Sequence, residues 1–265
     1  MSAEARNPLA RIGEFALAGI GEAGAMVQFL GRIVSSAVRP PFRFALILQQ
    51  AEFVGVGSLF IVLLTGFFTG AVFTLQSINV LERVGMESMV GSSVVLAVAR
   101  ELAPVLTALM VTGRVGSAMA TELGTMRVTE QIDAMEVMAV DPLRYLVVPR
   151  VVACAVMVPM LTILCDLIAG VGSYVVAVLF LGIDEGAFVE RIKLFVDPFD
   201  FLHGLYKAVV FGVLLALIGC YKGYNARGGA RGVGLATTQA VVLGSILIFV
   251  LDYIMTTILL AFEPR

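Results

Sequence analysis

From Phe53 to Leu81 the chain runs for 29 residues without one charged side chain. A helix needs about 20 apolar residues, each rising about 1.5 Å, to cross the hydrocarbon core of a bilayer. No water satisfies backbone N–H and C=O groups in that core, so a lone apolar segment of this length spans it as a helix. The sequence therefore predicts an integral membrane protein with an all-α fold.

The rest of the chain has the composition of a protein that lies mostly in lipid. Hydrophobic residues make up 59% and charged residues 14%, whereas soluble domains carry about 25% charged residues. Five segments are apolar enough to span, at residues 53–81, 89–113, 151–183, 205–221 and 237–262. No internal repeat is visible. We therefore predict one polytopic domain over residues 1–265, with its termini on opposite sides of the membrane.

The distribution of lysine and arginine predicts the orientation, because these residues are enriched in short cytoplasmic loops. With a cytoplasmic N-terminus, twelve fall on the inner side and four on the outer side, which places the C-terminus outside. The inner set is Arg6, Arg11, Arg32, Arg39, Arg43, Arg114, Arg127, Arg144, Arg150, Lys222, Arg227 and Arg231, and the outer set is Arg83, Arg191, Lys193 and Arg265.

Two segments are too polar to span and too apolar for open water. Residues 9–34 mix apolar side chains with charges such as Glu14 and Arg32, which predicts an amphipathic helix lying along the cytoplasmic leaflet. Residues 126–140, between Gly124 and the Asp141-Pro142 pair, have apolar residues at helical spacing. They predict a short cytoplasmic helix that either docks into a partner protein or rests on lipid headgroups.

Several classes of function are excluded by what the sequence lacks. Cys154, Cys165 and Cys220 have no paired spacing and His203 is the single histidine, so we expect no metal site in this chain. No lysine follows a glycine, so there is no phosphate-binding P-loop. If ATP is used, another chain binds it together with Mg²⁺. The formal net charge of −2 gives no general basic surface, so we expect no nucleic-acid partner.

Charges inside the predicted spans are the sharpest functional signal, because each costs at least about 2.5 kcal/mol at a helix centre. Arg100 and Glu101 lie just before Pro104, which removes a helix hydrogen bond and loosens that turn. The pair either forms a polar site beside a lumen, where a lipid headgroup or its counter-charge is bound, or belongs to an ion-pair network between spans. Both interpretations remain open from the sequence.

Three more charges lie in later spans. Lys207 is near the outer end of its span, where its ammonium can reach the interface. Asp252 lies halfway along the last span and must face protein or water, with Lys207 or Arg100 as its partner. Asp166 has Thr162 and Ser173 nearby, which favours a structural hydrogen-bonding role. No arrangement of His, Ser or Cys beside these groups suggests an enzyme.

The first span also offers a candidate apolar surface. Gly66 and Gly70 form a G-x-x-x-G pattern that favours close helix packing. The same span continues through Phe73, Gln76 and the Val80-Leu81 pair toward the outer side. These side chains either line a cavity that holds acyl chains or face bulk lipid.

A resemblance becomes specific between residues 100 and 150. Arg100-Glu101-Leu102-Ala103-Pro104 is followed by GRVGSAMATELGTMRVTEQIDAMEVMAVDPLRYLVVPR from Gly113 to Arg150. This stretch closely resembles the permeases of MCE-associated ABC transporters, the Mla-type phospholipid transport permeases of the bacterial inner membrane. Weaker likeness runs from Val54 to the C-terminus and includes LDYIMT around Asp252.

The resemblance implies a homodimer with two cytoplasmic ATPase subunits, a periplasmic hexamer of MCE-domain subunits and a phospholipid cavity at the dimer interface. The helix between the second and third spans would couple to the ATPase. The implied coupling residues are Glu130, Gln131, Asp133, Met135, Glu136 and Met138, and the implied lipid path is Phe73, Gln76, Val80, Leu81, Arg100, Glu101, Lys207 and Asp252.

We therefore expect the permease of an ATP-driven phospholipid transporter that serves outer-membrane lipid homeostasis. The alternative from another class is an ion-coupled secondary transporter that uses Glu101, Asp166 and Asp252. A third possibility is a structural membrane anchor for a periplasmic complex.

Overall fold

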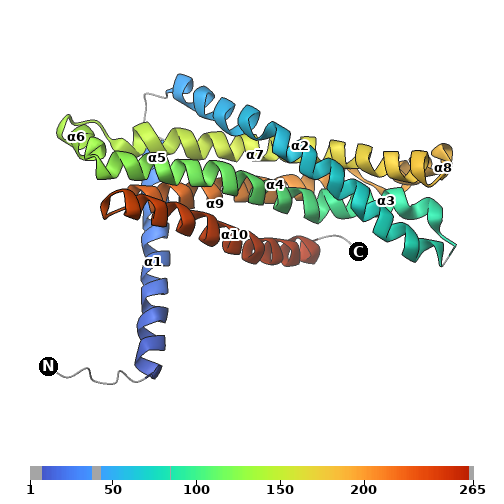
Figure 1. Cartoon of the computed structure of the whole chain (residues 1–265), viewed down its shortest axis with the longest axis horizontal. Helices are drawn as coiled ribbons and strands as arrows, with labels where there is room; N and C mark the ends of the chain where they lie inside the picture. Colours follow the sequence, from blue (N-terminus) through green and yellow to red (C-terminus); the bar gives the residue numbers. More distant parts are fainter. Residues whose placement is uncertain (1–7, 38–42, 84, 263–265) are drawn as a thin grey trace.

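The computed structural model describes residues 8–37, 43–83 and 85–262. Its helices form one elongated bundle, and the described residues contain no β-strand (Figure 1). Five helical segments are long and apolar enough to cross a membrane, as the sequence predicts. They run along the long axis of the bundle, whereas α1 (Pro8–Ala37) stands across that axis (Figure 1).

The first, fourth and fifth spans are the single helices α2 (Phe44–Glu82), α9 (Pro198–Tyr224) and α10 (Gly229–Phe262). The second and third spans are interrupted by π-helical turns. In order, the second span consists of η1 (Glu87–Met89), α3 (Val90–Ala97), η2 (Val98–Leu102), α4 (Ala103–Val111), η3 (Thr112–Gly116) and α5 (Ser117–Val128). The third consists of η4 (Leu143–Val147), α7 (Val148–Tyr174) and η5 (Val175–Phe180).

Two short helices lie outside the spans, at opposite ends of the bundle (Figure 1). Helix α6 (Gln131–Val137) joins the second span to the third, and α8 (Glu185–Phe195) joins the third to the fourth. The sequence did not predict α8. Its start is fixed by Asp184, whose carboxylate accepts a hydrogen bond of 2.8 Å from the backbone N–H of Ala187.

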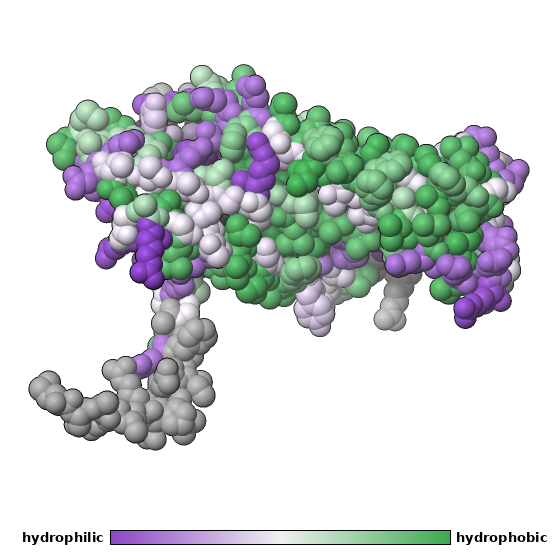
Figure 2. Space-filling view, viewed as in Figure 1, coloured by the Kyte–Doolittle hydropathy of each residue, from purple (hydrophilic) through white to green (hydrophobic). Residues whose placement is uncertain are grey.

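The spans are longer than the apolar runs predicted, mostly at the end where α6 lies (Figure 1). Helix α5, for example, continues to Val128, although the predicted span ended at Gly113. Hydropathy marks only the part of a helix that lies in hydrocarbon, and a helix continues beyond it wherever charged side chains are solvated or paired. Figure 2 shows the result, with apolar side chains over the middle of the bundle and polar ones at both ends.

Arg114 shows where the predicted loop boundary was wrong. The sequence analysis placed it in an inner loop, but it lies in the helical turn η3. Its guanidinium donates to the backbone oxygen of Phe53 and to the hydroxyl of Ser58, both at 3.0 Å. A Cβ on Gly57 would come within 2.1 Å of this guanidinium, so the glycine leaves room for the arginine to pack against α2.

Helix α1 has the geometry expected of a helix lying along a membrane surface. It packs on the bundle through Phe29, whose ring centroid lies 5.6 Å from that of Tyr221 and 5.8 Å from that of Tyr224. Ile20 and Val27 are exposed. The helix runs to Ala37, slightly beyond the predicted 9–34.

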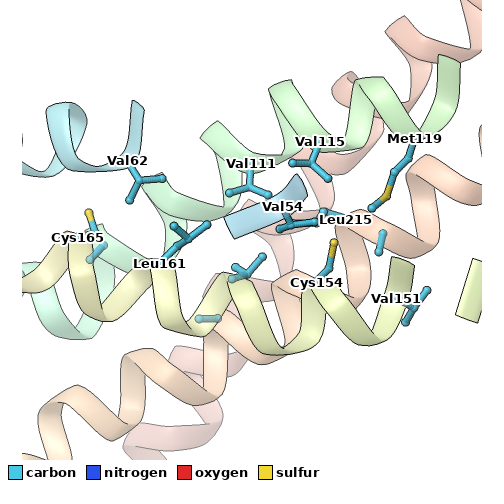
Figure 3. Close-up of a cluster of buried hydrophobic side chains, with 14 of the residues drawn as sticks. Val54, Val62, Val111, Val115, Met119, Val151, Cys154, Leu161, Cys165 and Leu215 are labelled. Carbon is cyan, nitrogen blue, oxygen red and sulfur yellow. The ribbon is translucent and has the colours of Figure 1, made fainter. Parts of the chain in front are cut away.

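Close packing of α2 on α7 forms the centre of the bundle. The carbonyl oxygen of Ala169 would lie 2.0 Å from a Cβ added to Gly70, so only glycine allows this approach, as the G-x-x-x-G pattern predicts. The Thr74 hydroxyl donates a hydrogen bond of 2.7 Å to Ser173 across the same interface. Figure 3 shows the neighbouring apolar core, in which α2, α4, α7 and α9 contribute side chains such as Val62, Val111, Leu161 and Leu215.

Candidate functional site

Arg100 and Glu101 lie in the π-helical turn η2, nearer to the Glu87 end of the second span than to its Val128 end. The turn closes through a hydrogen bond from the backbone N–H of Ala103 to the oxygen of Val98, five residues earlier. Pro104 follows in the first turn of α4 and has no N–H to donate. The loosened turn that the sequence predicts is therefore present, and π-helical turns of this kind are frequent at functional sites.

Lys207 of α9 is the centre of a buried polar cluster. Its side chain is 1% exposed, and its ammonium lies 2.5 Å from Glu101 Oε2 and 3.0 Å from Asp252 Oδ1. It also donates to the hydroxyl of Thr256 at 2.7 Å and to the backbone oxygen of Arg100 at 3.2 Å. The sequence left Lys207 and Arg100 open as partners of Asp252, and the structure pairs it with Lys207. The snorkelling interpretation of Lys207 was wrong, because the ammonium turns into the bundle.

Arg100 finds its partner at the start of α9. Its guanidinium contacts Asp200 Oδ1 at 2.6 Å. Asp200 also caps α9, since its second carboxylate oxygen accepts from the backbone N–H of Asp197 at 2.8 Å. One carboxylate therefore fixes both the start of α9 and the position of Arg100.

The charged cluster, defined as Arg100, Glu101, Asp200, Lys207 and Asp252, joins η2, α9 and α10. It is the ion-pair network that the sequence left as one of two interpretations. The cluster is not sealed, because the side chain of Glu101 is 42% exposed and that of Asp252 is 20% exposed. It therefore holds spans together, and the side chains of Glu101 and Asp252 reach the protein surface in part.

Asp166 differs from the predicted structural hydrogen-bonding role. It is buried, yet its Oδ1 has no hydrogen-bond partner among the described residues. The polar neighbours that suggested the role are occupied elsewhere, since Thr162 donates to the backbone oxygen of Val158 and Ser173 accepts from Thr74. The Asp166 carboxyl group is not part of the charged cluster.

A hollow of about 480 Å³ lies on the surface of α2. Two residues of the predicted lipid path, Phe73 and Gln76, line it together with Leu64, Thr65, Phe68, Thr69 and Val72. Val80 and Leu81 do not line it. Val80 is exposed one turn further on, and Leu81 packs partly buried against the core. All seven lining residues come from one helix, so this helix forms one side of the hollow and the other side is open.

The separate helix predicted at residues 126–140 is present but shorter than that range. Gly124 does not end a helix, because it is buried inside α5. The break comes at Glu130, whose φ of 60° places it in the left-handed region, and α6 follows from Gln131 to Val137. A single left-handed glutamate has no strong sequence signature, whereas glycine commonly marks such a position.

The side chains of this region divide into two sets. Asp133 pairs with Arg127, Glu136 accepts from the Tyr224 hydroxyl at 3.1 Å, and Met135 is partly buried against the core. The outward set is exposed instead: Glu130, Gln131, Val137 at 88% and Met138 at 67% exposure. The two methionines that the resemblance implies for coupling therefore differ, since Met138 is exposed and Met135 packs against the core.

Sequence reasoning missed Asp200 and Thr256 as members of the polar site. Asp200 lies before residue 205, where the fourth span was predicted to begin, although Asp197-Pro198 followed by an acid at the third helical position is a helix-start pattern. Thr256 had a weaker signal, its spacing of four residues from Asp252 on the same helix. Among the residues that the structure describes, no group of His, Cys, Asp or Glu could hold a metal ion.

Comparison with known proteins gives one consistent family. Residues 47–258 match the family described as Permease MlaE. A probable ABC transporter permease protein of Rickettsia felis is 45% identical over 233 residues, which cover 88% of this chain and 90% of the relative.

The intermembrane phospholipid transport system permease protein MlaE of Haemophilus influenzae is 39% identical over 243 residues, 91% of each chain. Protein TRIGALACTOSYLDIACYLGLYCEROL 1, chloroplastic, of Arabidopsis thaliana is 37% identical over 227 residues, which cover 86% of this chain and 65% of that protein. With the family match covering all five spans but for the first few residues of α2 and the end of α10, the chain belongs to the MlaE permease family.

Proposed function

We propose that this chain is the membrane-spanning permease of an ATP-driven transporter that moves phospholipid. The observation that carries the proposal is the family match over residues 47–258, together with a Haemophilus influenzae relative whose name describes intermembrane phospholipid transport. The chain supplies the path and no bond chemistry. ATP and Mg²⁺ bind to a separate ATPase subunit.

The two surfaces of the candidate site suit an amphiphile better than an ion. The hollow on α2 offers apolar walls through Phe68 and Phe73, and the charged cluster offers carboxylates and an arginine to a headgroup. The hollow needs an opposite wall, since one helix lines it. A second copy of the chain supplies this wall in a homodimer, and lipid is held between the copies.

Helix α6 is the element suited to receive the ATPase. Its outward set of Glu130, Gln131, Val137 and Met138 combines polar and apolar groups on a short helix that the rest of the chain leaves uncovered. Nucleotide binding in the ATPase would displace α6 and, through α5 and α7, the spans. Each nucleotide state must favour a different arrangement for this coupling to work.

The orientation follows from the charge bias. The α6 end of the bundle faces the cytoplasm with the N-terminus, and the α8 end faces the periplasm with the C-terminus. In this arrangement the transporter lies in the bacterial inner membrane, with a hexameric ring of MCE-domain subunits on the α8 side. Lipid passes between this membrane and the periplasmic ring.

The family match does not favour an ion-coupled secondary transporter. Two of the three carboxylates that such a mechanism needs, Glu101 and Asp252, already share the Lys207 ammonium. A structural anchor would require neither an open polar cluster nor an exposed α6.

The test uses the complex that purifies with this chain. A photo-crosslinking residue at Phe73 should capture phospholipid, and capture should fall when ATP and Mg²⁺ are added. The control position is Met160, which is exposed on α7 and outside the hollow, where capture of surrounding lipid should not depend on ATP. Absence of a copurifying ATPase, or equal nucleotide dependence at both positions, would refute the proposal.

A further inference from the structure

The orientation of α6 depends on side chains that tie it to other helices. The helix has seven residues, and among them only Ile132 is fully buried. The backbone is unfavourable at both of its ends, because Glu130 at φ 60° and Ala139 at φ 58° lie in the left-handed region without being glycine. Such residues keep this conformation only where the surrounding structure fixes it.

Two acidic side chains of α6 supply these ties. The Asp133 carboxylate pairs with the Arg127 guanidinium of α5. The Glu136 carboxylate accepts a hydrogen bond of 3.1 Å from the hydroxyl of Tyr224, the last residue of α9. The two ties are themselves in contact, since the guanidinium carbon of Arg127 lies 5.9 Å from the centre of the Tyr224 ring. Helix α6 is thus fixed at two positions three residues apart, which share one face of a helix.

Tyr224 also reaches α1, the helix that stands across the long axis of the bundle (Figure 1). Its ring centroid lies 5.8 Å from that of Phe29, and Phe29 is buried. Closely packed side chains transmit a displacement from one helix to the next, because there is little empty space between them. Tyr224 therefore joins three elements: α1 through Phe29, α5 through Arg127 and α6 through Glu136.

We propose that Tyr224 is a positioning residue, which holds α6 in the orientation that the ATPase recognises and links this orientation to α1. This role rests on the proposed function, in which α6 receives the ATPase. Glu136, which the resemblance implies as a coupling residue, then acts from within the chain by holding α6, while the outward set contacts the ATPase. Through Phe29 and Tyr224, a displacement of α1 changes the position of α6.

The first measurement is amide hydrogen exchange of residues 131–138 in the full chain, purified in neutral detergent with its copurifying subunits. Tyr224→Phe keeps the ring and removes the hydroxyl, so exchange in α6 should rise about fivefold, the effect of losing one hydrogen bond. Glu136→Leu should give the same rise, and the double variant no more than either single one, because both remove the same bond. Glu136→Gln keeps an acceptor oxygen and should raise exchange less than Glu136→Leu.

Tyr221→Phe is the matched control. Tyr221 lies on the same helix, and its ring centroid is 5.6 Å from that of Phe29, but no hydrogen bond joins its hydroxyl to α6. Exchange in α6 should therefore stay at the wild-type rate. Phe29→Leu should raise it, because the ring against which Tyr224 packs is lost. Unchanged exchange in Tyr224→Phe, or an equal rise in Tyr221→Phe, would overturn the proposal; a rise in Tyr224→Phe without one in Phe29→Leu would refute the link to α1.

The second measurement separates positioning from general stability. In the complex reconstituted in vesicles, Tyr224→Phe should lower the lipid transferred per ATP hydrolysed by up to about fivefold, the factor by which the restraint on α6 weakens. The KM for ATP and the unfolding midpoint should stay at wild-type values, because the lost bond is exposed. An unchanged ratio refutes the positioning role. If the wild-type complex contains no ATPase, the proposed function fails, whereas exchange in the chain itself still decides whether Tyr224 holds α6.

Discussion

Replacing Lys207 by methionine keeps the length of the side chain and removes the only ammonium of the charged cluster. In the wild type this ammonium lies 2.5 Å from Glu101 and 3.0 Å from Asp252. Without it, two carboxylates face one another beside an apolar side chain. The substitution therefore tests whether the cluster stabilises the bundle.

The magnitude follows from burial. Breaking a buried ion pair by removing one partner costs about 3–5 kcal/mol. The side chain of Lys207 is 1% exposed, but Glu101 at 42% and Asp252 at 20% are partly screened by their surroundings. We therefore expect the lower end, about 3 kcal/mol, which corresponds to a shift of roughly a hundredfold in the unfolding equilibrium.

The assay is unfolding in mixed micelles with increasing sodium dodecyl sulfate, followed by loss of helical circular dichroism. Lys207→Met should unfold at lower detergent fraction, and adding Asp252→Asn should restore part of the loss by removing one unpaired carboxylate. Lys193→Met, on the exposed face of α8, is the control. Unchanged unfolding of Lys207→Met, or no recovery in the double variant, would refute the ion-pair reasoning.

Three further predictions follow from other parts of the fold. Gly70→Ala should destabilise the protein by about 1–3 kcal/mol, because the added Cβ would lie 2.0 Å from a carbonyl oxygen of α7. Gly170→Ala is the control in the same unfolding assay and should not destabilise the protein, because no atom lies within 4 Å of its added Cβ. Val137→Asp should reduce ATPase copurification without changing that unfolding, because the side chain is 88% exposed; normal assembly would argue against docking at α6. A cysteine at Glu190 should react with an impermeant thiol reagent from the periplasm and one at Asn225 should not; the opposite result would invert the proposed orientation.

The five spans could be predicted from sequence because the bilayer imposes a minimum apolar length that few other structures meet. Their ends could not. Arg114 is charged, so it appeared to lie in a loop, and Arg127 was placed in a separate helix at residues 126–140, yet both belong to the helical second span. Arg127 pairs with Asp133 and Arg114 donates to α2. Charge alone does not end a helix when tertiary partners satisfy it, and these partners lie on other elements.

The charged cluster was partly visible in the sequence. The charges inside the predicted spans were identified, because an ionised group in hydrocarbon is energetically costly and therefore marks a structural or functional role. The pairing required the fold, since Lys207 and Asp252 lie on different helices and Arg100 had several possible partners. Asp200 was overlooked because the sequence analysis did not place the start of a helix there. Its carboxylate points into the bundle only because the residue lies in the first turn of α9.

The position of the cluster on α10 explains why its charges are retained in the membrane. One face of α10 is buried at intervals of about four residues, at Ala236, Ala240, Gly244 and Ile248, and the next two positions in that series are Asp252 and Thr256. Apolar packing thus holds the first half of α10, whereas hydrogen bonds and an ion pair to Lys207 hold the second half. Apolar surface gives little net driving force between helices in lipid, where polar contacts supply it instead. In Lys207→Met, amide hydrogen exchange should therefore rise in residues 250–261 and stay unchanged in residues 233–248; uniform exchange along α10 would mean that the helix is held as one unit.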